Sequence, residues 1–170
     1  MEDRLILVDI DDNPIGEAGK LEAHVKSLLH RAFSVFLYKD GKMLIQKRAD
    51  DKYHSGGLIA NTCCSHPRVG EELQDAVKRR LMEEAGVECP VKHLTSFIYR
   101  ERFEDMCEYE YDHIFVGEYD GQFKCNLQEA QEMYYEDVEY IAKDIVENPQ
   151  KYAAWFITAF PIVYKHIKEE

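Results

Sequence analysis

Two glutamates placed two positions apart, Glu108 and Glu110, have the type and spacing of metal ligands. On a strand both carboxylates would point to one face, because side chains alternate with a period of two. Three histidines, His24, His30 and His66, would then give one divalent cation a mixed nitrogen and oxygen shell of five or six ligands. The alternative is a solvated edge strand with ordinary surface histidines.

The chain also carries a candidate reactive thiol. Five cysteines, two of them adjacent as Cys63 and Cys64, do not form an even disulfide framework. No apolar stretch resembles a signal peptide or a membrane span, so we expect reduced thiols and a cytoplasmic location. Cys64 lies two residues before His66, which brings its thiol near the metal-ligand candidates. The plainer alternative is a buried cysteine serving as a small core residue.

A helix is predicted over residues 71–85, ended by Gly86 in a left-handed C-cap. The apolar residues that share one arc of this helix are Leu73, Ala76, Val77 and Leu81. Arg80 and Glu84 fall inside the same arc, and a charged pair on a core-facing side is costly without a partner or a metal. We therefore expect a site under this helix; the alternative is an ordinary i,i+4 ion pair.

The remaining elements follow from alternation and turn residues. Strands are expected over residues 5–10, 31–38, 43–48, 94–103 and 108–118, with a short strand ending at Cys63 and Cys64. Asp40 and Gly41 predict a hairpin turn between the second and third strands. Helices are expected over residues 137–147 and 153–168, with Pro161 kinking or breaking the second. The segment from residue 15 to residue 30 has a mixed pattern.

Composition limits the class of protein and of partner. Of 170 residues, 45% are hydrophobic and 12% aromatic, which predicts one globular domain over residues 1–170. The formal net charge of −12 argues against nucleic acid or an anionic membrane as partner, because a protein binds either of them through a positively charged surface. We expect a small molecule instead. If it is an anion, a few local cations or a metal must meet it.

Residues 65–87 resemble the Nudix box, whose pattern is Gly, five residues, Glu, seven residues, and Arg-Glu-apolar-x-Glu-Glu-x-Gly-apolar. The residues at matching positions are Glu71, Arg79, Leu81, Glu83, Glu84, Gly86 and Val87. Ser65 replaces the first glycine, and Arg80 replaces the glutamate that follows Arg79. In Nudix hydrolases these glutamates gather magnesium to activate water, so the change to arginine weakens the hydrolase interpretation.

Further motifs make the chain similar to the type I isopentenyl diphosphate isomerases, an isomerase branch of the Nudix superfamily. They are Lys20 with His24, His30-Arg31-Ala32-Phe33-Ser34, Asn61-Thr62-Cys63-Cys64-Ser65-His66-Pro67, Arg79-Arg80, Glu108-Tyr109-Glu110 and Trp155-Phe156. The resemblance implies an α/β Nudix fold, a mixed β-sheet sandwiched between helices. It also implies interconversion of isopentenyl and dimethylallyl diphosphate by proton addition and removal through a tertiary carbocation-like species.

The resemblance assigns roles to particular residues. The catalytic group would be Cys64, Glu110, Tyr99 and Trp155, and the diphosphate would be held by Lys20, Arg48, Lys52 and Arg80. One divalent metal, Mn²⁺, Zn²⁺ or Mg²⁺, would be bound by His24, His30, His66, Glu108 and Glu110. A second ion, Mg²⁺ carried by the substrate, would meet Glu84 and Cys64. Acid and base would act from opposite sides of a dry pocket, with the indole of Trp155 facing the cation.

Two other functions remain open at this point. A Nudix pyrophosphohydrolase acting on a nucleotide-type diphosphate would use the same helix. A non-catalytic binding module would use the His/Glu cluster as a structural metal site. The sequence leaves open the identity of the metal and the oligomeric state; it predicts a prenyl diphosphate as the partner and neither nucleic acid nor a membrane.

Overall fold

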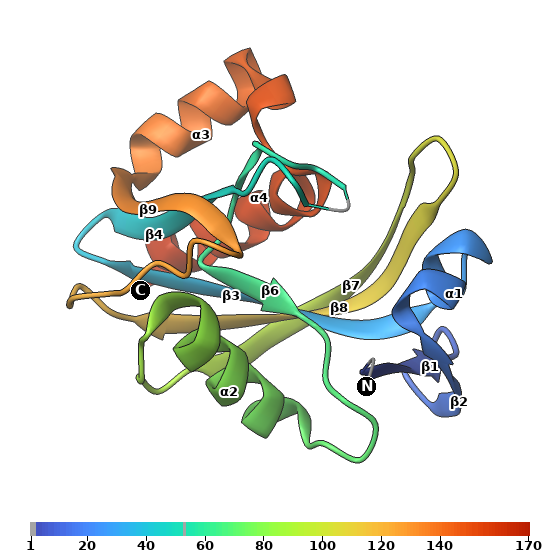
Figure 1. The fold of residues 1–170 in the computed structure, drawn as a ribbon. Helices are drawn as coiled ribbons and strands as arrows, with labels where there is room; N and C mark the ends of the chain where they lie inside the picture. The colour runs from blue at the N-terminus through green and yellow to red at the C-terminus, as the bar shows by residue number, and fades with distance from the viewer. Residues whose placement is uncertain (1–2, 53) are drawn as a thin grey trace.

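Residues 3–52 and 54–170 are described by a computed structural model, in which helices cover both faces of a curled sheet (Figure 1). The strands are β1 (Arg4–Val8), β2 (Pro14–Gly19), β3 (His30–Lys39), β4 (Lys42–Arg48), β5 (Ile59–Ala60), β6 (Cys63–Ser65), β7 (Lys92–Arg102), β8 (Cys107–Glu118) and β9 (Ala130–Asp137). The helices are α1 (Lys20–Val25), α2 (Leu73–Ala85), α3 (Val138–Glu147) and α4 (Ala154–Glu169), with a 3-10 turn η1 (Pro149–Lys151).

Strand β3 organises the sheet. It pairs antiparallel with β1, β4 and β6 and parallel with β8, so the sheet is mixed as predicted. The register with β8 sets His30 opposite Glu110, and the register with β6 sets Ser34 opposite Cys64. Strand β7 adds Tyr99 opposite Glu110 on the outer side of β8. Pairing alone therefore brings residues from distant segments toward one region of the sheet.

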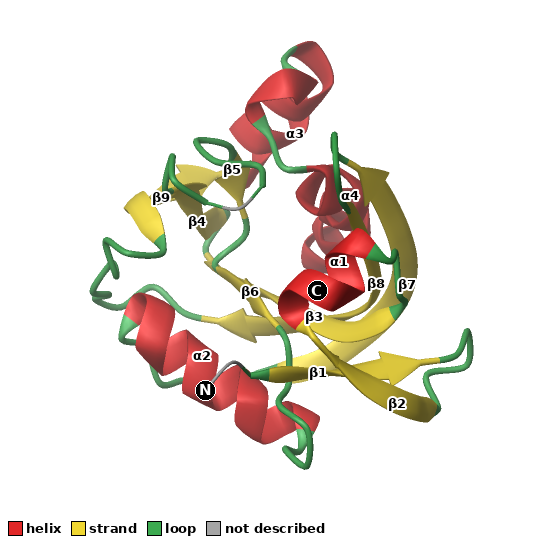
Figure 2. Cartoon of the chain, turned by 45° about the vertical axis from the view of Figure 1, so that its right-hand side comes forward, coloured by secondary structure: helices red, strands yellow, loops and turns green. Residues whose placement is uncertain are grey.

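The side chains of β3 show how the two faces are divided. Phe33, Val35 and Leu37 lie in a core with α2, whereas Phe36 and Tyr38 lie in a core with α3 and α4. This alternation is the period of two expected for a strand that is buried on both faces. Figure 2 shows α2 on one side of β3 and β6 and α4 on the other. The predicted sandwich of a sheet between helices is confirmed.

Two strands, β2 and β9, were not predicted. Strand β2 contains a proline and two glycines and, within residues 3–52 and 54–170, pairs only with β1; an edge position tolerates such residues. Strand β9 is rich in acidic residues but pairs with β4 along its length. Neither has a strong local pattern, so tertiary pairing decides their conformation. Helix α2 begins two residues later than predicted and ends as expected at Gly86, whose φ is +62°.

The last helix contains a proline that does not end it. Helix α4 continues through Pro161 to Glu169, so of the predicted kink or break, the break does not occur. Trp155, Phe156, Phe160 and Val163 are buried on one side of α4, and this packing outweighs the backbone hydrogen bond that proline cannot make. Among the described residues, no helix combines the length and the hydrophobicity needed to span a bilayer.

Replacing Pro161, which is exposed, by alanine should raise the free energy of unfolding by about 1 to 3 kcal/mol. Alanine restores a backbone N–H to the helix interior and relieves the clash of the ring with the preceding turn. Urea denaturation would measure the change. The neighbouring variant Ile162→Ala is the control and should lower stability slightly. A decrease for Pro161→Ala would mean that the packing of α4 depends on the proline.

Candidate active site

A cavity of about 340 Å³ opens on the sheet beside α2 and α4. The predicted site residues that line it are Lys20, Arg48, Lys52, Cys64, His66, Arg80, Glu84, Tyr99, Glu108, Glu110 and Trp155. His24 and His30 do not line the cavity, and their side chains are fully buried against Glu108. The fold therefore brings together residues as far apart in the chain as Lys20 and Trp155.

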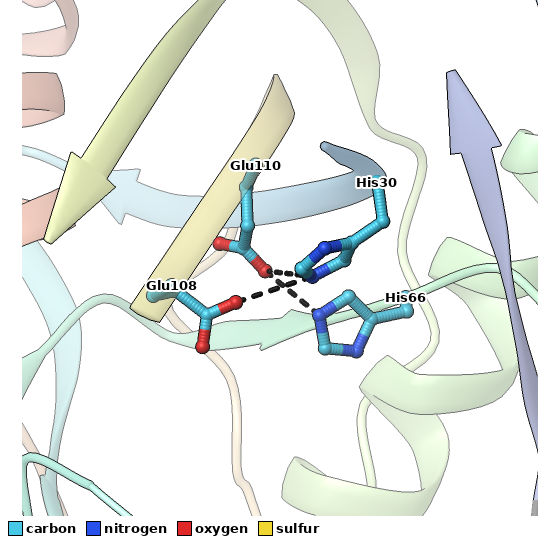
Figure 3. A group of neighbouring side chains, drawn as sticks. All are labelled: His30, His66, Glu108 and Glu110. Carbon is cyan, nitrogen blue, oxygen red and sulfur yellow. Dashed lines mark hydrogen bonds and ion pairs between the residues drawn. The ribbon is translucent and has the colours of Figure 1, made fainter. Parts of the chain in front are cut away.

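Four side chains form a compact group at the inner end of this site: His30, His66, Glu108 and Glu110 (Figure 3). Nε2 of His66 lies 2.7 Å from a carboxylate oxygen of Glu110. Nε2 of His30 lies 3.2 Å from Glu108 and 3.5 Å from Glu110. Their four ligand atoms all lie within 4.8 Å of one another. This spacing suits a single divalent cation with nitrogen and oxygen ligands.

The alternation of β8 explains why the two glutamates reach this group together. Glu108 and Glu110 share one face of the strand with Ile114 and Val116, which lie in the core with α4. The same face carries Asp112, which the sequence analysis missed although it continues the period of two. Burial and the nearby Glu110 raise the pKa of Asp112 well above its usual range, and its carboxyl accepts a hydrogen bond from Ser34 at 2.8 Å.

The backbone orients two of the histidines as ligands. Nδ1 of His24 lies against the carbonyl of Lys20, and Nδ1 of His30 lies 2.9 Å from the carbonyl of Leu28. A carbonyl only accepts, so Nδ1 carries the proton in both rings. In the neutral ring Nε2 then presents a lone pair, as in histidines that bind metals. Both Nε2 atoms face Glu108.

A nitrogen lone pair facing a carboxylate is repulsive unless a proton or a cation lies between them. Burial lowers the pKa of His30, but Glu108 and Glu110 outweigh it and raise the pKa to about 10. Within the described part of the chain, Nε2 of His30 and Oε1 of Glu108 are buried without a hydrogen-bond partner. A divalent cation would satisfy both atoms and replace the proton, so the donor set fits a metal.

The expected five-ligand shell is divided in the structure. His24 lies 2.8 Å from Oε2 of Glu108 and belongs to a second group with Glu108 and His54. His54 was not predicted: it follows β4 in a loop, and nothing in its spacing from the other histidines distinguishes it. Its Nε2 lies 2.7 Å from the same Oε2 of Glu108. Glu108 is therefore shared by the two groups.

The adjacent cysteines point to opposite faces of β6. Cys63 lies in the core with α2, whereas Cys64 lines the cavity. Burial raises the pKa of the Cys64 thiol to about 12, and the opposing effect of Arg48 does not offset it. Nη1 of Arg48 lies 3.9 Å from the Cys64 sulfur. In the metal-free protein Cys64 is therefore a protonated thiol at neutral pH.

The other reactive candidates line the same cavity. Tyr99 is 9% exposed, and burial together with the nearby Glu110 raises the pKa of its phenol, which also hydrogen-bonds Glu110. The indole nitrogen of Trp155 donates to Asn61 at 3.0 Å, which holds the ring in place. The guanidinium carbon of Arg48 lies 4.9 Å from the centre of the Trp155 ring. A cation thus already contacts the π-face that was predicted to meet a carbocation.

Two of the cations predicted for the diphosphate, Arg80 and Lys52, pair with carboxylates. Arg80 pairs with Glu84, as the ion-pair alternative predicts, and it also lies 3.3 Å from Glu129. Lys52 pairs with Glu129 as well. Arg80 and Glu84 nevertheless line the cavity, so the pair forms part of the site. Glu129 was missed because no element was predicted around it.

The fold and the cavity place the chain in the class of NUDIX-domain proteins. The family model of the NUDIX domain matches residues 28–156. Among solved structures, a protein of Deinococcus radiodurans has a TM-score of 0.77 at 17% identity, covering 95% of this chain and 99% of that one. The MutT protein of Methanosarcina mazei has a TM-score of 0.68 at 17% identity, covering 82% and 96%. At such identities these similarities establish the fold alone.

Curated relatives specify the branch. The chain is 48% identical over 158 residues to isopentenyl-diphosphate Delta-isomerase 2 of Photorhabdus laumondii, covering 92% of this chain and 89% of that protein. It is 46% identical over 157 residues to isopentenyl-diphosphate Delta-isomerase 2 of Aromatoleum aromaticum, covering 91% and 83%. The chain therefore belongs to the NUDIX family and, within it, to the isopentenyl-diphosphate Delta-isomerases. The resemblance noted in the sequence is confirmed.

Alkylation of Cys64 in the metal-free protein should be slow at pH 8 and should accelerate about tenfold per pH unit up to pH 10, because only the thiolate reacts. With a pKa raised to about 12, the thiolate fraction keeps rising over this range. An ordinary thiol with a pKa near 8.5 would level off at about pH 9.5. Peptide mass spectrometry after iodoacetamide treatment of Cys63→Ala, which removes the adjacent thiol, would give the rate. A plateau near pH 9 would contradict the prediction.

Proposed function

We propose that this protein interconverts isopentenyl and dimethylallyl diphosphate within a single domain. The observation that carries the proposal is the placement of two proton-transfer candidates in one cavity. Cys64 belongs to β6 and Glu110 to β8, and these strands pair with opposite edges of β3. A substrate lying across β3 would therefore meet the thiol on one side and the carboxylate on the other. A 1,3 shift of a double bond needs this arrangement of an acid and a base.

The proton steps follow from the chemistry of the substrate. Protonation of the terminal alkene carbon of isopentenyl diphosphate leaves a tertiary cation. Loss of a proton from the CH₂ group between the cationic carbon and the CH₂–O group then gives dimethylallyl diphosphate. Cys64 is one proton-transfer group, and Glu110 with the hydrogen-bonded phenol of Tyr99 is the other. Because the reaction is reversible, each group is the acid in one direction and the base in the other.

The cavity supplies the two further requirements of this reaction. Trp155 is 3% exposed and anchored to Asn61, so its ring is fixed where a π-face can stabilise a cation. Arg48, Lys52 and Arg80, with Lys20, are cations concentrated at one site of a chain whose net charge is −12. The carboxylates that pair with Lys52 and Arg80 are exchangeable for phosphate oxygens, which bind guanidinium groups in the same geometry.

Two metal ions complete the proposal. The group of His30, His66, Glu108 and Glu110, with His24 beside it on Glu108, would hold Mn²⁺, Zn²⁺ or Mg²⁺, and such an ion would lower the cost of burying two carboxylates. Glu84 and Cys64 would hold a Mg²⁺ bound to the diphosphate. Support for the first ion is the lone-pair geometry of the histidines; support for the second is that Glu84 is buried on the cavity wall.

The proposed setting is the cytoplasm, with a soluble prenyl diphosphate as partner. The cysteines of the described chain are free, which agrees with a reducing compartment. The negative net charge supports a small-molecule partner over nucleic acid. A pyrophosphohydrolase is the competing function, and Arg80 disfavours it because an arginine stands where the box would offer a magnesium ligand.

The proposal is tested by incubating the protein with isopentenyl diphosphate, Mg²⁺ and Mn²⁺ in deuterated water. The expected product is dimethylallyl diphosphate carrying deuterium, which NMR detects, with no release of phosphate. Release of inorganic phosphate or diphosphate would instead establish the hydrolase. Bound metal without any turnover would establish a binding module.

Glu110→Gln should lower turnover by a factor of about 10² to 10⁴ while part of the bound metal is retained. Glutamine keeps the shape and one coordinating oxygen but cannot exchange a proton. Glu108→Gln should act mainly through metal affinity, so added Mn²⁺ should restore its activity. Metal content and turnover must be measured on the same samples. Rescue of Glu110→Gln to near the unmodified rate by excess metal would show that this residue is only a ligand.

A further inference from the structure

His54 contacts four parts of the cavity. Its ring lies parallel to Phe103, with centroids 4.9 Å apart at 24°, and it meets Trp155 edge-on at 5.9 Å. Its carbonyl accepts a hydrogen bond from Nη2 of Arg48 at 3.3 Å. Its Nε2 lies 2.7 Å from Oε2 of Glu108. One side chain therefore touches the proposed metal site, the indole and the β7–β8 hairpin, and its backbone holds a proposed diphosphate ligand.

The loop that carries His54 is constrained next to it. Ser55 has a φ of +55°, in the left-handed region that residues with a side chain rarely adopt. A Cβ on Gly56 would lie 2.5 Å from the carbonyl oxygen of Asp50, so only glycine fits there. Strained and close-packed backbone of this kind persists where the surrounding structure requires one conformation. The position of His54 is thus set by its loop as well as by its own contacts.

The surroundings of its two ring nitrogens distinguish His54 from the metal-ligand histidines. Nδ1 of His24 and of His30 faces a backbone carbonyl, which leaves Nε2 with a lone pair for a metal. Nδ1 of His54 instead lies 3.2 Å from the hydroxyl of Ser55, which is able to donate. In a neutral His54 ring, Nδ1 then accepts and Nε2 carries the proton. Such an Nε2–H donates to Glu108 and is not a ligand.

The two oxygens of Glu108 are accordingly used differently. Oε2 is contacted by Nε2 of His54 at 2.7 Å and by Nε2 of His24 at 2.8 Å, whereas Oε1 faces Nε2 of His30 and is buried without a hydrogen-bond partner in the described chain. We propose that His54 is a positioning residue: its Nε2–H holds Oε2 of Glu108, so that Oε1 points into the metal site. Through this contact the loop after β4, which carries His54, affects the affinity for the metal. This inference rests on the metal site proposed above.

Two substitutions separate the hydrogen bond from the packing of the ring. His54→Phe keeps an aromatic ring against Phe103 but has no donor, whereas His54→Gln keeps an N–H donor without the ring. Asp51→Asn, at an exposed position of the same loop, is the control. The probe is Mn²⁺ alone, added to metal-free protein without substrate, with the free ion measured by EPR. Circular dichroism verifies that each variant is folded.

His54→Phe should weaken Mn²⁺ binding by about 10- to 100-fold, the range for losing a hydrogen bond to a metal ligand, with the number of bound ions unchanged. His54→Gln should stay close to the unmodified protein, and Asp51→Asn should not differ from it. Unchanged affinity in His54→Phe, or equal losses in both His54 variants, would overturn the inference. A loss of one bound ion would overturn it in favour of direct ligation. Absence of Mn²⁺ binding by the unmodified protein would instead refute the metal site itself.

Discussion

The structure depends on the burial of two neighbouring carboxylates, Glu108 and Glu110, which are 2% and 8% exposed. Ionised carboxylates cannot remain in a protein interior without paired charge, because desolvation costs several kcal/mol or more for each group. The parallel pairing of β3 with β8 meets this need by placing His30 directly opposite Glu110. The short helix α1 and the segment after β6 deliver two further histidines. These elements thus supply the histidines that compensate the buried charge of Glu108 and Glu110 on β8.

The strands that carry the site also contribute to the cores. On β6 the alternation of side chains decides which residue does which, whereas on β8 the position along the strand decides it. On β6 this assigns Cys63 to the core with α2 and Cys64 to the cavity. On β8 the apolar residues Ile114 and Val116 lie in the core under α4, on the same face that carries the carboxylates farther toward the start of the strand. The site is therefore built on the same strands as the two cores.

The cations of the site are held in a different way, by exchangeable partners. Arg80 and Lys52 both contact Glu129, and Arg48 lies over Trp155. The contacts of Arg80 and Lys52 are ion pairs with carboxylates, the kind of partner that a phosphate group replaces. His54 lies between the His/Glu group and the cations, because its ring contacts Glu108 and its carbonyl accepts a hydrogen bond from Arg48.

The amino-acid sequence by itself determined the family, the hairpin and α2, and the period of two that sets Glu108 beside Glu110, and it proposed many of the residues that line the cavity, because these are carried by local patterns and contiguous motifs. Tertiary structure decided the rest. Strands β2 and β9 form through pairing with β1 and β4, and α4 passes through Pro161 because packing outweighs local preference. His54 and Glu129 reach the cavity only after the chain has folded. Both lie in loops, where no periodic pattern of residues predicts which side chains will be their neighbours.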